Sequence, residues 1–130
     1  MKILKGSRLH RLGPCILLAA GLLVFTGGGN AWAHAFPDHS DPRVGSTVDS
    51  PPAIVRIWFD GALEPAFCTI SVTNSSGARV DKGTGRVSPE DPNLLEAAVP
   101  RLSSGTYRVI WNVVARDGHR TTGDYSFSIK

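Results

Sequence analysis

The chain has 130 residues, with 14 lysines and arginines against 11 aspartates and glutamates, a formal net charge of +3. Four of the basic residues and no acidic residue lie in the first 33 positions, so residues 34–130 carry 10 bases and 11 acids, a net charge of −1. This charge excludes nucleic acid and anionic membrane as partners, because both attract a basic surface. The same 97 residues can form one small domain with a single core.

A basic stretch, an apolar stretch and a small-residue motif follow one another at the start of the chain. Residues 1–13 carry the four bases, residues 15–25 are mostly apolar, and Ala31-Trp32-Ala33 has the pattern of a cleavage site. The apolar stretch is shorter than the ~20 residues of a membrane-spanning helix. We therefore expect residues 1–33 to be a signal peptide for export to the periplasm or beyond, and His34 to be the first residue of the mature protein.

Four segments of residues 34–130 alternate apolar and polar residues, as half-buried strands do. In chain order their apolar faces are Val55, Ile57 and Phe59; Cys68, Ile70 and Val72; Tyr107, Val109, Trp111 and Val113; and Tyr125, Phe127 and Ile129. The third segment, Gly105 to Arg116, is the longest, and weaker signals cover residues 78–87 and 94–99. Turn-forming pairs such as Ser76-Gly77 separate the segments. The pattern predicts an all-β sandwich of about seven strands.

The cysteines provide no disulfide framework. Cys15 lies in the expected signal peptide, which leaves Cys68 as the single cysteine of the mature chain. Cys68 belongs to the apolar face of its predicted strand, where a free cysteine is usually a small core residue. We therefore expect a buried thiol, with a ligand or redox role as the alternative.

His34 has unusual metal-binding capacity if cleavage follows Ala33. Its α-amine and its imidazole Nδ1 can then bind one ion together and close a six-membered chelate ring. An interior histidine offers one nitrogen at a time, whereas the free amine exists here only because nothing precedes His34 in the mature chain. The alternative is a histidine that occupies this position by chance.

Asp117-Gly118-His119 follows the longest predicted strand and precedes the last one. An aspartate and a histidine on either side of a glycine can point to the same side of a tight turn. Asp-Gly is also a strong signal for an ordinary hairpin turn, which is the alternative. If the start of the mature chain lies beside the last strands, His34, Asp117 and His119 would offer three nitrogens and one oxygen, a tetragonal set that suits Cu(II).

Several short motifs extend over residues 34–130. They are His34-Ala35 after the Ala-x-Ala site, Pro42 with Gly45-Ser46, Val55-Arg56-Ile57-Trp58-Phe59, Glu64-Pro65-Ala66-Phe67, Gly105-Thr106-Tyr107-Arg108-Val109-Ile110-Trp111, Asp117-Gly118-His119 and Gly123-Asp124-Tyr125-Ser126-Phe127. In order and spacing they resemble the CopC family of periplasmic copper-resistance proteins. The resemblance implies an Ig-like Greek-key β-sandwich or barrel that binds copper without catalysis. It also implies Cu(II) ligands at His34, through amine and imidazole, and at Asp117 and His119.

The chain departs from the family pattern in three places. Met1 is its only methionine, so the methionine-rich Cu(I) loop of some members is absent and the chain resembles the Cu(II)-only type. A carboxylate that some members carry near the Cu(II) site is replaced by Gly61, for which Asp60 or Glu64 could substitute. Many members also have a histidine two residues after the first, where this chain has Phe36. His39 lies nearby and is left unassigned.

Together these features predict an exported carrier that holds one Cu(II) and delivers or sequesters it. The resemblance implies a CopD-like inner-membrane partner. We expect that partner to be a separate chain, because the sequence ends at Lys130 directly after the last predicted strand.

Two other classes of protein compete with this prediction. Copper monooxygenases that cleave polysaccharides also bind the metal through an N-terminal histidine. However, 97 residues leave little area for a polysaccharide-binding face, and Asp117 would fill the position that these enzymes keep open. A metal-free Ig-like interaction module is the third interpretation, should His34 not be the mature N-terminus.

Overall fold

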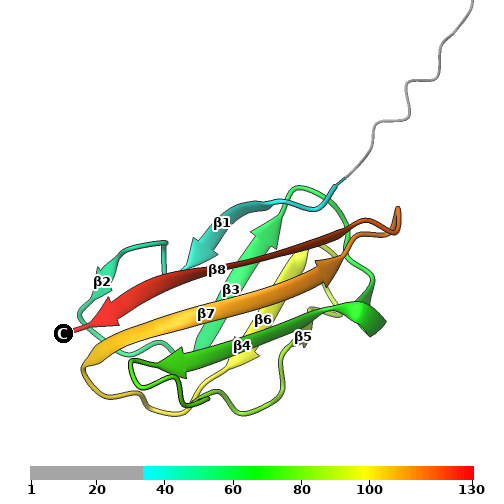
Figure 1. Ribbon diagram of the computed structural model, residues 1–130. Coiled ribbons are helices and arrows are strands. Elements are labelled where there is room, and N and C mark those ends of the chain that lie inside the picture. The colour runs from blue at the N-terminus through cyan, green and yellow to red at the C-terminus, as the bar shows by residue number, and fades with distance from the viewer. Residues whose placement is uncertain (1–33) are drawn as a thin grey trace, which may run out of the picture.

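The computed structural model describes residues 34–130, and the expected signal peptide at residues 1–33 lies outside this part. Its strands form two four-stranded sheets that pack face to face (Figure 1), with the orders β1-β3-β6-β5 and β2-β8-β7-β4. The strands are β1 (Pro37–Asp41), β2 (Thr47–Val48), β3 (Ile54–Phe59), β4 (Thr69–Asn74), β5 (Arg86–Val87), β6 (Leu94–Ala98), β7 (Gly105–Val114) and β8 (Arg120–Ile129). The predicted all-β sandwich is confirmed. In this part of the chain no helix is long and apolar enough to cross a membrane.

The core lies between the two sheets and consists of the alternating apolar residues of the sequence. The inward faces of β3, β4, β7 and β8 are buried as predicted, and the Phe59 and Trp111 rings meet edge to face across the sheets with centroids 5.3 Å apart. Cys68 is buried and free, and its Sγ donates to the Glu64 carbonyl oxygen at 3.1 Å. The expectation of a core cysteine is therefore confirmed.

The predicted strand at residues 78–87 is wrong over most of its length. Arg79 forms a single isolated bridge with Thr73, and only Arg86 and Val87 form a strand, which pairs with β6. In the preceding loop the Asp81 side chain, which is fully buried, accepts hydrogen bonds from the backbone N–H groups of Val72 and Gly83, each at 2.8 Å. Gly83 has a φ of +72°, a conformation that a strand residue does not adopt. A side chain thus satisfies backbone donors that a longer strand would have paired.

The first two strands carry the chain from one sheet to the other. β1 pairs antiparallel with β3 in the first sheet, whereas β2 pairs parallel with the end of β8 in the second. The residues that precede β1 lie beside the beginning of β8 (Figure 1), and the Ala35 carbonyl accepts a hydrogen bond from Thr121 of that strand. This arrangement places His34 at the same end of the molecule as the β7–β8 hairpin.

Candidate metal centre

The β7–β8 hairpin turns through a three-residue loop, Arg116 to Gly118. The Gly118 N–H donates to the Ala115 carbonyl at 2.9 Å, and the Ala115 N–H donates to the His119 carbonyl at 2.9 Å. Gly118 has a φ of +90°, which glycine adopts without the steric cost of a side chain. The predicted Asp-Gly turn is thus present, and it is the common hairpin loop that closes with a left-handed glycine.

The turn directs the side chain of Asp117 toward His119. Asp117 Oδ1 accepts a hydrogen bond from the His119 backbone N–H at 2.9 Å, and Oδ2 lies 3.1 Å from His119 Nδ1. The His119 N–H holds the pKa of the Asp117 carboxyl below its ordinary value. The neighbouring imidazoles of His119 and His34 lower it further, against a smaller opposing effect of desolvation. Asp117 is therefore an anion at neutral pH.

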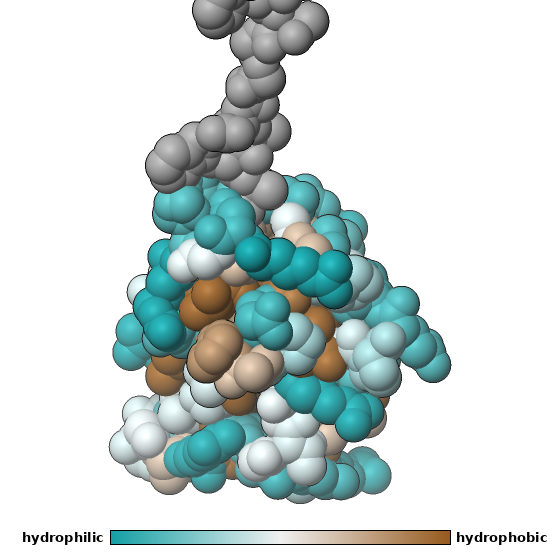
Figure 2. All heavy atoms as spheres, turned by 90° about the vertical axis from the view of Figure 1, so that its right-hand side faces the viewer, coloured by the Kyte–Doolittle hydropathy of each residue, from teal (hydrophilic) through white to brown (hydrophobic). Residues whose placement is uncertain are grey.

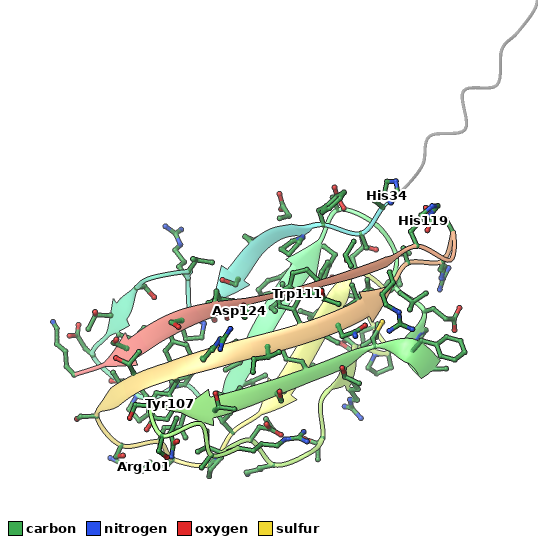
Figure 3. The ribbon with its side chains drawn as sticks, viewed as in Figure 1. His34, Arg101, Tyr107, Trp111, His119 and Asp124 are labelled. Carbon is green, nitrogen blue, oxygen red and sulfur yellow. The ribbon has the colours of Figure 1, made fainter. Side chains whose placement is uncertain are left out.

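His34, the first of the described residues, lies beside this turn (Figure 3). Its imidazole meets that of His119 edge to face, with ring centroids 4.3 Å apart. His34, Asp117 and His119 each offer one ligand atom, and these atoms all lie within 4.8 Å of one another. Within residues 34–130 this is the one group of three or more histidine, cysteine or acidic side chains with such spacing.

The spacing and chemistry of this group suit a single metal ion. Metal–nitrogen and metal–oxygen bonds of about 2.0–2.2 Å place two ligand atoms about 3–4 Å apart across one ion. The ligand atoms of this group, all within 4.8 Å of one another, are close to this spacing. The two imidazole nitrogens of this set favour divalent copper or zinc, because magnesium and calcium prefer oxygen ligands alone.

His39 lies outside the group. Its ring stacks on Trp58, with centroids 4.4 Å apart and an angle of 9° between the planes. Its Nδ1 lies 2.9 Å from Asp38 Oδ2. His39 is therefore part of the outer surface of the first sheet.

Asp60 and Glu64, the acids considered as substitutes at Gly61, also lie outside the group. Asp60 Oδ1 accepts a hydrogen bond from the Phe36 backbone N–H at 2.7 Å. Sequence reasoning missed this contact, and it also missed Thr121, whose hydroxyl donates to the Ala35 carbonyl at 2.7 Å. The position of Thr121 two residues after His119 was the available signal, since strand residues two apart share a face.

The end of the sandwich that carries the group also has apolar surface. Figure 2 faces this end and shows apolar residues gathered at its centre, with hydrophilic residues around them. Phe36 and Phe67 are 53% and 60% exposed. Phe36 lies beside the group, with its ring centroid 5.8 Å from that of His34. Phe67 ends η1 (Pro65–Phe67), the short 3-10 helix at the same end of the molecule.

Comparison with known proteins identifies the family. The family model described as the CopC domain matches residues 38–130. The chain therefore belongs to the CopC family, as the sequence motifs predict.

Three individual relatives match most of the described domain in sequence or in structure. The chain is 31% identical to copper resistance protein C of Xanthomonas campestris pv. juglandis, over 88% of this chain and 91% of that protein. The crystal structure of CopC from Methylosinus trichosporium OB3b superposes with a TM-score of 0.70 at 32% identity, covering 75% of this chain and 94% of that one. PcoC, a methionine-rich copper resistance protein from Escherichia coli, superposes with a TM-score of 0.65 at 30% identity, covering 75% and 100%. Membership of this family confirms that the chain is not an enzyme.

Proposed function

We propose that the protein is an exported Cu(II) carrier that binds one ion through the His34 amine and imidazole, the Asp117 carboxylate and the His119 imidazole. The observation that carries this proposal is the convergence of these three side chains, from the beginning of the domain and from its last hairpin, to within 4.8 Å. The relatives named for copper resistance support copper as the metal.

The proposed ligands explain the choice of Cu(II). Cleavage after Ala33 would add the α-amine to the two imidazoles, and three nitrogens with one oxygen suit the tetragonal geometry of this ion. The Asp117 carboxylate, which is ionised at neutral pH, offsets part of the charge of the metal. Zinc fits less well because it prefers a tetrahedral site.

The carrier would act in the periplasm, where it sequesters copper or passes it to a CopD-like protein of the inner membrane. The metal group lies at one end of the sandwich and is half-exposed, so an acceptor could reach the ion directly. The exposed Phe36 and Phe67 at the same end give such an acceptor an apolar surface to contact.

Selectivity between the oxidation states of copper tests this proposal. The mature protein should bind one Cu(II) tightly and Cu(I) weakly, because soft thioether ligands are absent and the thiol of Cys68 is buried. Burial also raises the pKa of this thiol, which disfavours the thiolate that a metal would need. Titrations against competing chelators for each ion measure both affinities. Cu(I) binding as tight as that of a methionine-rich site would contradict the proposal.

The affinity for Cu(II) should fall as the pH falls, because protons compete with the metal for nitrogen ligands. Imidazoles and α-amines generally take up protons between about pH 6 and 8. The lowered pKa of Asp117 keeps this carboxylate ionised over the same range, so the nitrogens alone should set the dependence. We expect proton release on binding and a steep loss of affinity below about pH 6–7, measurable by titration in several buffers. An affinity that stayed constant from about pH 5 to 8 would exclude nitrogen ligands.

A further inference from the structure

We propose that Asp60 and Thr121 form a clamp on the first residues of the mature chain and thereby hold His34 beside His119. This inference rests on the proposed copper site, and it identifies residues that position a ligand without binding the metal. The first residues of a domain are usually poorly ordered unless contacts tie them down. A metal site built on such a residue must otherwise order it at the moment of binding, at a cost in conformational entropy.

Asp60 ties the chain to the first sheet. It directly follows β3, and its Oδ1 accepts the hydrogen bond from the Phe36 N–H at 2.7 Å. Its own backbone N–H donates to the Phe36 carbonyl at 2.9 Å. These two bonds extend the pairing of β1 and β3 beyond Pro37, which has no N–H to donate. Phe36 is thereby fixed two residues after His34.

Thr121 ties the chain to the second sheet. It lies in β8, opposite the buried Val113 of β7, and its hydroxyl donates to the Ala35 carbonyl at 2.7 Å. His119 and Thr121 are two residues apart, so their side chains share one face of the hairpin. Ala35 is completely buried and belongs to the core. The residue next to His34 is therefore held by packing and by a hydrogen bond.

The two attachments act on adjacent residues and belong to opposite sheets. They leave His34 little freedom except rotation of its own side chain and amine, at a place where its ring lies beside that of His119 (Figure 3). A ligand held in its bound position before binding loses less entropy when the metal arrives. Loosening the clamp should therefore speed the loss of copper without changing which atoms bind it.

Thr121→Val tests the clamp, with Thr122→Val as the matched control. Both replace a β8 threonine hydroxyl with a methyl group, but Thr122 is exposed and, as the next residue of the strand, belongs to the opposite face from Thr121. In the metal-free exported protein, Thr121→Val should lower the NMR order parameters of Ala35 and Phe36 from about 0.85 toward about 0.6. It should also speed Cu(II) transfer to a chelator about tenfold, with the nitrogen couplings of the bound ion unchanged. Thr122→Val should alter neither quantity.

Asp60→Ala and Asp60→Asn separate a clamp from a copper ligand. Asparagine keeps the oxygen that accepts the Phe36 N–H, so Asp60→Asn should retain the wild-type transfer rate while Asp60→Ala releases Cu(II) about tenfold faster. An equal loss in both variants with an altered copper spectrum would make Asp60 a ligand and overturn the clamp. Wild-type order parameters and transfer rate in Thr121→Val would overturn it as well. If the wild-type protein did not bind Cu(II), the proposed function itself would fail, and the clamp could not serve it.

Discussion

One alanine inserted between Ala33 and His34 is expected to lower the Cu(II) affinity of the exported protein by more than about 100-fold. This loss exceeds the roughly 10- to 100-fold loss of metal affinity that is typical when a residue beside the metal ligands is changed. The insertion keeps every side chain but converts the His34 α-amine into an amide, which does not bind metal at neutral pH. The chelate ring is then lost. A competitive chelator titration measures the effect, with mass spectrometry to establish the N-terminus of each protein.

A control for this insertion is an alanine added after Lys130, since the C-terminus lies at the end of the sandwich away from His34 (Figures 1 and 3). The control protein should bind Cu(II) like the wild type. The metal-free thermal midpoint should change little in both proteins, because the core does not include the amine. Wild-type affinity in the N-terminally extended protein would mean that the amine is not a ligand.

His119→Ala is expected to weaken Cu(II) binding to a similar extent, by more than about 100-fold. It removes one of three nitrogens from the proposed site. His39→Ala is the matched control, since His39 is exposed, stacks on Trp58 and lies outside the metal group. Isothermal titration of both variants should therefore give an affinity near that of the wild type for His39→Ala alone. A comparable loss in both variants would assign the binding to surface histidines in general.

Substitution of Asp117 should cost less, about 10- to 100-fold, because a water molecule can replace one oxygen ligand. Its two oxygens have different roles in the structure, since Oδ1 accepts the His119 N–H and Oδ2 lies beside His119 Nδ1. Asp117→Asn keeps an acceptor for that N–H, whereas Asp117→Ala also removes a bond that shapes the turn. We therefore expect the alanine variant to bind Cu(II) more weakly than the asparagine variant in the same titration.

The sequence was sufficient to predict the sandwich because its core residues repeat every second position over long strands such as β7 and β8. It was insufficient for β1, where Ser40 is the single buried residue and no alternation exists. It also failed over most of residues 78–85. There the backbone N–H groups of Val72 and Gly83 donate to the buried Asp81 carboxylate and do not pair in a longer strand. A charged residue in the sequence gives no sign that it will be buried and hydrogen-bonded in this way.

The proposed ligands could be chosen from the sequence because each has a local signature, an expected free amine for His34 and an Asp-Gly turn for Asp117 and His119. Their proximity depends on the residues before β1 lying beside the beginning of β8, which only the structure provides. The spacing of Thr121 from His119 indicates that the two residues share a face, but the backbone groups that Asp60 and Thr121 contact could not be predicted. These contacts join residues 24 and 86 positions apart and use a side chain to bind the backbone, an interaction without a sequence pattern.

Electron paramagnetic resonance of the exported protein with one equivalent of Cu(II) tests the central claim most directly, because it reports the geometry of the ion and its nitrogen ligands together. We predict a tetragonal spectrum with coupling to three nitrogens. Labelling only the histidine rings with ¹⁵N should change two of these couplings and leave that of the His34 amine unchanged. A spectrum in which ring labelling changed every nitrogen coupling, or in which no histidine coupling appeared, would contradict the amine-anchored copper site.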